Sequence, residues 1–205
     1  MKAKSKKAIA SLIILAIAAV FSITAFGAEY LGEGNSSTKL RWSVISNSKY
    51  STEVYSLLPS GHGASSYVPS GVSKINTQSP SNIRCVVSTF NSSNVDLLQP
   101  SEDTWDAHGY DYLADAVTIP RSTSGRYYYK LSDVPSSGTI YINYAQIMFH
   151  PGNMPHPGNE WISMIMHELC HVYGMGTSGK DSVTSIPGLT QLSAEDISEF
   201  RRMYP

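Results

Sequence analysis

Residues 160–174 read EWISMIMHELCHVYG, and this stretch predicts the structure around it. His167 and His171 are four residues apart, so on a helix they lie one turn above each other on one face. Two imidazoles on one face can bind one zinc ion, and Glu168 beside them has the position of a general base. The stretch therefore predicts a zinc-binding helix that ends at Gly174.

The other side of this helix is apolar. It consists of Ile162, Ile165, Met166, Leu169, Val172 and Tyr173. Because such a stripe is normally buried, we expect it to pack on a sheet and to leave the two histidines and the glutamate on a wet face. Two ordinary surface histidines are the alternative interpretation. The glutamate at the required position and the glycine after the motif favour a zinc helix.

The N-terminus has the features of a signal peptide. Four lysines precede an apolar run over residues 8–26, and Ala25-Phe26-Gly27 fits a cleavage site. We expect residues 1–27 to be removed and residues 28–205 to form one secreted domain. An uncleaved N-terminal membrane anchor is the alternative, because the apolar run is long enough to span a bilayer.

The charge of the expected mature chain argues against two classes of partner. Without the four N-terminal lysines, 11 basic and 16 acidic residues remain, a net charge of −5. A mildly acidic chain without a basic block is not typical of nucleic-acid-binding proteins or of proteins held on membranes by a polybasic patch. We expect the mature chain to be a monomer.

The two cysteines, Cys85 and Cys170, allow two interpretations. Export would place them in an oxidising compartment, where a disulfide is permitted. Such a bridge would close a long loop and could stabilise the fold by about 4 kcal/mol. Alternatively, both are small buried side chains that pack between helix and sheet.

Hydrophobic periodicity predicts the other elements. Strands are expected at residues 39–45, 83–90, 113–120, 126–131 and 138–147, and helices at 66–78 and 193–204. Residues 53–58 are expected to form one or two helical turns, and residues 91–103 a polar loop. Expected local features are Asn159 as N-cap of the zinc helix, a capping box of Ser193 with Asp196, and His62 in a solvated loop.

Residues 104–111 combine aromatic, acidic and histidine side chains. Such a segment could hold a structural Ca²⁺ or a second zinc ion, but its spacing matches no ligand pattern. A surface loop with a packed Trp105 is the simpler interpretation.

The order of these parts resembles the catalytic domain of the matrixin-type metzincin zinc proteases, in a minimal bacterial secreted form. The resemblance is specific over H-E-x-x-H-x-x-G at residues 167–174 and over residues 192–205, where the chain reads Leu-Ser-x-x-Asp-Ile and ends Tyr-Pro. It is only architectural over residues 39–150. It implies an α+β, zincin-like fold: a twisted, mostly parallel sheet on two helices, with a small C-terminal subdomain ending in a helix.

The resemblance also implies a function. His167 and His171 would bind one catalytic Zn²⁺, Glu168 would be the catalytic base, and Asp196 matches the acidic position that opens the family's last helix. The chain would then be a secreted zinc endopeptidase that hydrolyses peptide bonds of proteins with a metal-activated water. An extended substrate would lie along an exposed sheet edge, at residues 113–120 or 126–131, with pocket walls from residues 186–189.

Two positions depart from the family pattern. Thr177 stands where the family has its third zinc ligand, and a hydroxyl is a poor zinc ligand. Thr184 or Ser185 stands where the family has a methionine below the metal. A catalytically impaired domain that acts as an extracellular binding module is therefore the alternative function.

The identity of the third ligand is open. Asp181 lies four residues after Thr177 and could reach the metal from the same loop. Other candidates are His108, His150, His156 and Glu195. If none of these reaches the metal, Thr177 or a water completes the shell.

Overall fold

The computed structural model describes residues 38–110, 114–129, 133–135, 137–152, 156–176, 183 and 188–205. The expected signal peptide lies outside these residues, as do both third-ligand positions in the loop, Thr177 and Asp181, and the Thr184 and Ser185 positions. Residues 186 and 187 of the expected pocket wall at residues 186–189 are also outside them. Within the described residues, no helix has both the length and the apolar character needed to cross a membrane.

The described residues form a seven-stranded mixed sheet. The strands are β1 (Thr38–Trp42), β2 (Ile45–Ser46), β3 (Lys49–Ser56), β4 (Ile83–Val87), β5 (Val95–Leu98), β6 (Ala116–Ser122) and β7 (Gly138–Phe149). Pairing is parallel between β1 and β7, β3 and β4, β3 and β5, and β5 and β7. It is antiparallel between β2 and β3 and between β6 and β7. The expected mixed, mostly parallel sheet is confirmed.

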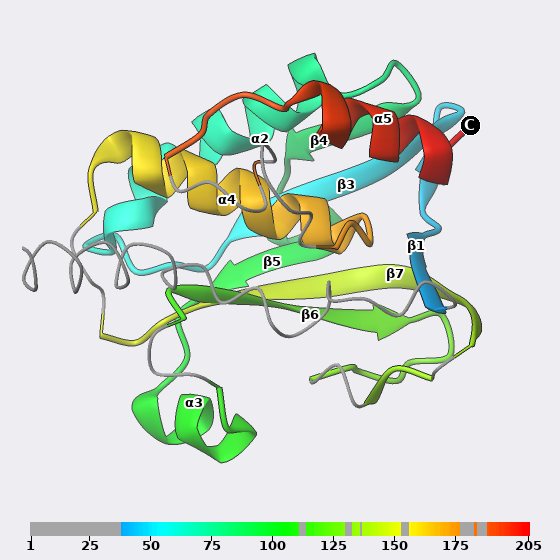
Figure 1. Ribbon diagram of the computed structural model, residues 1–205. Coiled ribbons are helices and arrows are strands. Elements are labelled where there is room, and N and C mark those ends of the chain that lie inside the picture. The colour runs from blue at the N-terminus through cyan, green and yellow to red at the C-terminus, as the bar shows by residue number, and fades with distance from the viewer. Residues whose placement is uncertain are drawn as a thin grey trace, which may run out of the picture.

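Helices lie on both faces of this sheet. They are α2 (Val68–Gln78), α3 (Glu102–His108), α4 (Gly158–Val172) and α5 (Ala194–Met203), with 3-10 helices η1 (Gly63–Tyr67) and η2 (Phe90–Ser92). Figure 1 shows α2, α4 and α5 on one side of the sheet and α3 on the other. The main core lies under the first three, and a smaller cluster joins Trp105 of α3 to Val117, Ile119 and Met148. A sheet packed on helices, with a helix at the C-terminus, is the predicted fold class.

The apolar stripe of α4 is buried as expected, and it places this helix at the centre of the main core. Ile165, Met166 and Leu169 have no exposed surface. Gly71 of α2 lets the two helices approach closely, because a Cβ atom there would lie 2.6 Å from Cγ2 of Ile165. Helix α4 is therefore fixed by packing along its length rather than by its ends alone.

Three predictions of secondary structure between residues 53 and 111 are wrong. Residues 53–58 were expected to be helical, but Lys49–Ser56 is strand β3. The expected loop 91–103 contains strand β5, whose Asp96 interrupts the apolar pattern and accepts hydrogen bonds from Tyr144 and Ser93, both at 2.7 Å. The expected loop at 104–111 is largely helix α3, which Ser101 caps through the Thr104 N–H. Trp105 is packed as expected, with no exposed surface.

Local features give mixed outcomes. The Ser193–Asp196 capping box of α5 is confirmed. The N-cap of α4 is Pro157 rather than Asn159, and no side chain caps that end. The prediction of a solvated His62 is wrong, because it is buried and its Nδ1 accepts from the Ala64 N–H at 3.1 Å. Among the described part of residues 126–131, only a single bridge between Tyr127 and Arg121 is present instead of a strand.

Cys85 and Cys170 are two buried free thiols. The disulfide is therefore not formed, and the packing alternative holds. Burial raises the pKa of the Cys85 thiol to about 12, which keeps this thiol protonated and unreactive.

Gly174 follows the C-terminal end of α4 in a conformation that favours glycine. Its φ is +84°, and an added Cβ atom would collide with the backbone carbonyl of Leu40 in β1. Gly174→Ala is expected to lower the free energy of unfolding by at least about 2 kcal/mol, from left-handed strain plus the collision. Gly125→Ala is the matched control, since φ is +87° and the space is open. Equal losses for both variants in chemical denaturation would contradict the contact with β1.

Candidate metal and catalytic site

The two motif histidines converge on one point. Their Nε2 atoms are 3.0 Å apart, and their rings are nearly perpendicular, at 86°. Two imidazole nitrogens bound to one tetrahedral zinc ion are roughly 3.3 Å apart, given Zn–N bonds of about 2.0–2.1 Å. A shift of a few tenths of an ångström would therefore let His167 and His171 share one ion.

The surroundings keep both imidazoles in the form that binds metals. Burial lowers the pKa of His167 and His171, so both rings are neutral near pH 7. The Nδ1 of His171 lies 2.7 Å from the carbonyl oxygen of Met175 and donates to it, which leaves the Nε2 lone pair available. This hydrogen bond orients the second histidine toward the first.

Glu168 lies beside the pair and is buried. Its Oε2 is 2.6 Å from the Thr118 hydroxyl of β6, and its Oε1 is 3.8 Å from Nε2 of His167. Burial raises the pKa of Glu168 to about 8, and the Thr118 hydrogen bond opposes this rise. A carboxyl group whose pKa is near neutrality can both take and return a proton.

The expectation of a wet face on α4 is wrong for the described structure. The exposed fractions are 1% for His167, 1% for Glu168 and 5% for His171. The helical periodicity correctly separates the chemical side from the stripe that packs in the core. It does not reveal that β6, through Thr118, covers the chemical side as well.

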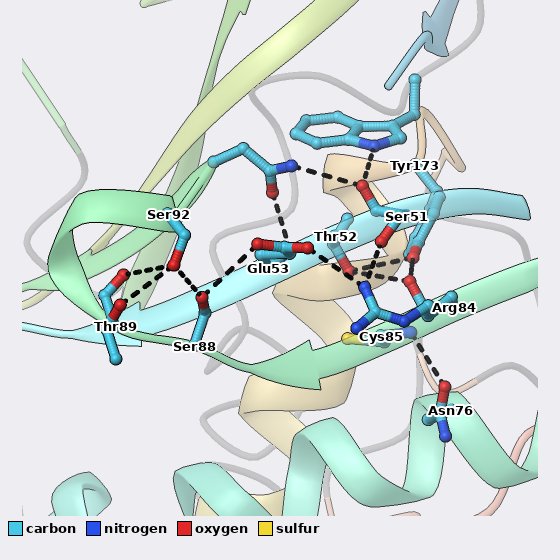
Figure 2. A network of polar contacts seen from close by, with 12 residues as sticks. Ser51, Thr52, Glu53, Asn76, Arg84, Cys85, Ser88, Thr89, Ser92 and Tyr173 are labelled. Atoms are coloured by element: carbon cyan, nitrogen blue, oxygen red, sulfur yellow. Dashed lines mark hydrogen bonds and ion pairs between the residues drawn. The ribbon is translucent and has the colours of Figure 1, made fainter. Parts of the chain in front are cut away.

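Tyr173 fixes the C-terminal end of α4 to the sheet. Its hydroxyl donates to the Arg84 carbonyl at 2.8 Å and lies 2.9 Å from the Thr52 hydroxyl, which must then be the donor of that second bond. Figure 2 shows this hydroxyl reaching the polar network that joins β3 and β4. The Tyr204 hydroxyl donates to the Tyr173 carbonyl and accepts from the Trp42 N–H at 2.9 Å. Strands β3 and β4 and the C-terminal Tyr204 thus hold the end of α4.

Asp196 connects α5 to Val183, which follows α4 in the chain. Its Oδ2 accepts from the Val183 N–H at 3.1 Å, the Ser193 N–H at 2.8 Å and the Ser193 hydroxyl at 3.0 Å. A backbone hydrogen bond to Val183 also acts on His167, where it raises the pKa and opposes the effect of burial. The backbone of Val183 therefore links Asp196, in the first turn of α5, to His167 of α4.

The described residues supply no third protein ligand. No group of three or more His, Cys, Asp or Glu side chains that could hold a metal occurs among them. Among the described residues, none of the candidates His108, His150, His156 and Glu195 forms such a group with the two motif histidines, and residues 104–110 form none either.

Three of these side chains have other surroundings than the two histidines of α4. His108 stacks on Tyr129 with 4.6 Å between ring centroids, and Glu195 is an exposed residue in the first turn of α5. Nδ1 of His150 accepts from the Gly152 N–H at 2.9 Å. The two imidazoles of α4 fit a zinc ion, whose remaining ligands would have to be water or residues outside the described ranges.

His156 joins the start of α4 to the start of β6. Its Nε2 lies 3.2 Å from Oδ1 of Asp115, and its Nδ1 lies 3.1 Å from Oε2 of Glu160. The Asp115 hydrogen bond, with a smaller contribution from Glu160, raises the pKa of His156 above its ordinary value despite partial burial. Both ring nitrogens are engaged in this ion-pair cluster, which therefore stabilises the fold rather than binding a metal.

This cluster predicts a pH-dependent stability. Because the pKa of His156 is raised in the folded state, its contribution is complete below about pH 6.5 and is lost as the pH rises through the folded value. His156→Gln is expected to lower the free energy of unfolding by about 1–2 kcal/mol at pH 5.5 and by much less at pH 9. Urea denaturation at both pH values measures this difference, and an equal loss at both would contradict the ion pairs.

The sequence analysis did not predict three groups of the site: the Thr118 hydroxyl, the Tyr173 hydroxyl that anchors α4, and the Met175 carbonyl. Thr118 is a polar residue between the apolar Val117 and Ile119, and this alternation places it on the opposite face of the strand from its neighbours. The alternation could have shown that Thr118 points away from them. It could not have shown that Glu168 is the partner, because that contact depends on how the helix lies against the sheet.

Similarity to known proteins is weak. No family model matches the sequence, and no curated protein matches it. Among solved structures, the crystal structure of myroilysin is similar to this chain, with a TM-score of 0.40 and 12% sequence identity, covering 85% of this chain and 94% of that chain. Similarity at this level carries no functional conclusion, so the function has to be judged from the residues of α4 and β6.

Proposed function

We propose that this chain is a secreted zinc-dependent endopeptidase with Glu168 as its general base. The observation that carries the proposal is the convergence of two neutral imidazoles, with Nε2 atoms 3.0 Å apart, beside a buried carboxyl group on one helix. A helix with this spacing of two histidines and a glutamate is the pattern of metal-dependent peptide hydrolysis. We expect a monomeric protein whose partner is a peptide or protein.

His167 and His171 would hold the metal through their Nε2 atoms. A zinc ion there would polarise the scissile carbonyl and make a nearby water more acidic. Glu168 takes one proton from this water and later delivers it to the leaving nitrogen, which becomes the new amine. Burial raises the pKa of Glu168 to about 8, which favours the protonated form that delivers the proton to the leaving nitrogen.

The edge strand β6 is the proposed place for an extended substrate. Within the described residues it pairs with β7 on one side, and its other side has only the Arg121–Tyr127 bridge near its C-terminal end. Its Pro120 lacks an N–H, as is common in edge strands. Because the motif side chains have almost no exposed surface, a peptide can reach them only if the chain around this face rearranges.

The second candidate function is a binding module without catalysis. Thr177 at the expected third-ligand position supports it, because a hydroxyl binds zinc weakly. The retention of Glu168, with a hydrogen-bond partner of its own in Thr118, favours the enzyme, because a binding module has no use for a buried base.

Hydrolysis of a fluorescence-quenched peptide library tests the proposal. The mature protein is expected to cleave peptides, to lose this activity when a chelator removes zinc, and to regain it with one equivalent of zinc. His171→Ala is expected to lose the activity, and His108→Ala, which alters a histidine outside the site, is expected to keep it. A zinc-loaded wild type that cleaves no peptide would leave the binding module as the function.

A further inference from the structure

The only side-chain hydrogen bond described for the Glu168 carboxyl group comes from the edge strand. The Thr118 hydroxyl is 2.6 Å from Oε2 and 3.1 Å from the main-chain carbonyl of Glu168, and Thr118 is 5% exposed. The Thr118 hydroxyl is the donor to Oε2. The hydroxyl has one hydrogen, and the shorter distance assigns it to Oε2.

This bond makes the two carboxylate oxygens different. Oε2 is held by Thr118, while Oε1 lies on the side of the metal pair, 3.8 Å from Nε2 of His167. The terminal torsion of a glutamate has a broad energy minimum, so an unpartnered carboxylate would rotate. Thr118 therefore selects the oxygen that faces the two motif histidines.

The backbone of Thr118 lies on the open side of β6. In an antiparallel strand, the N–H and C=O of one residue point to the same side, and successive residues alternate. The Pro120 carbonyl accepts from the Tyr128 N–H at 3.0 Å, so Pro120 faces away from β7. The register is regular up to Arg121, and Thr118, two residues before Pro120, therefore faces the same open edge.

We propose that Thr118 is a positioning residue that couples substrate binding on β6 to the orientation of Glu168. This inference rests on the proposed function. The Thr118 main chain pairs with the extended peptide, and its hydroxyl keeps Oε1 of Glu168 toward the water. In the reaction the water oxygen bonds to the carbonyl carbon, the C–N bond breaks, and the proton taken by Oε1 goes to the leaving nitrogen.

Replacement of Thr118 separates orientation from binding. Thr118→Val removes the hydroxyl but keeps the shape and the backbone, so kcat is expected to fall about 10–100-fold with KM and zinc content unchanged. Thr118→Ser restores the hydroxyl and is expected to recover most of kcat. A fall in kcat of less than about threefold for the valine variant, or equal losses for both variants, would overturn the positioning role.

A readout without activity comes from the metal-free protein. The unfolding midpoints of the wild type, Thr118→Val, Glu168→Gln and the double variant form a thermodynamic cycle. The shift caused by Thr118→Val is expected to be clearly smaller when Glu168 is already glutamine, and equal shifts would overturn the contact. If Thr118→Val cleaves like the wild type while Glu168→Gln is inactive, only the positioning role fails. If the wild type cleaves nothing, the proposed function fails and the positioning role fails with it.

Discussion

Replacement of Glu168 by glutamine is expected to lower kcat for peptide hydrolysis by about 10²–10⁴-fold, the usual contribution of a general base. The amide has nearly the same shape, so it can keep the contact with the Thr118 hydroxyl, which lies 2.6 Å away in the wild type. It cannot take a proton from water at neutral pH. The zinc content should be unchanged, because neither histidine is altered. Steady-state kinetics together with zinc analysis measure both quantities.

Glu195→Gln is the matched control for this variant. It makes the same chemical change at an exposed glutamate in the first turn of α5. We expect its kcat to lie within about twofold of the wild type, because among the described residues Glu195 forms no metal-binding group with His167 and His171. If Glu168→Gln kept the wild-type kcat, another group would have to be the base and the proposed mechanism would be wrong.

Asp196→Ala is expected to lower the free energy of unfolding by about 2–4 kcal/mol. The substitution removes the Asp196 half of the capping box of α5 and leaves the buried N–H of Val183 and the partly buried N–H of Ser193 without their acceptor. Because Asp196 connects the Val183 segment to α5, zinc affinity should fall as well. Guanidinium denaturation of the metal-free protein measures the stability, and competition with a chromogenic chelator measures the affinity.

The corresponding control is Glu195→Ala, one residue earlier in the same turn. It removes a favourable charge near the helix N-terminus and should cost no more than about 0.5 kcal/mol. Equal losses of stability for Asp196→Ala and Glu195→Ala would show that the contact with Val183 does not contribute. A loss of stability with unchanged zinc affinity would restrict Asp196 to capping α5.

The sequence predicted the elements whose patterns are local. Helix α4 was predictable because its apolar residues recur at helical spacing, and the start of α5 because Ser193 and Asp196 form a capping box within one turn. The parallel strand β5 was not predictable. It has only four residues, and Asp96 interrupts their apolar run although its carboxylate finds partners in the folded state. Strand β3 was missed for a related reason, because its polar face carries the Glu53–Arg84 ion pair shown in Figure 2.

The candidate site was predictable only in part. His167, Glu168 and His171 belong to one helical motif, and their spacing alone places them together. Thr118 is 50 residues from Glu168 in the sequence, and the contact depends on how α4 crosses β6. The burial of the three motif side chains was also hidden, since helical periodicity shows which residues share a face but not what covers that face. Long-range packing therefore determined what the sequence analysis missed.

The zinc content of the purified mature protein tests the central claim most directly. Elemental analysis after gel filtration is expected to give about one zinc ion per chain for the wild type and almost none for His167→Ala or His171→Ala. His108→Ala, outside the site, should match the wild type. A wild type with no more zinc than the two site variants would contradict a zinc site on α4, and with it the proposed peptidase.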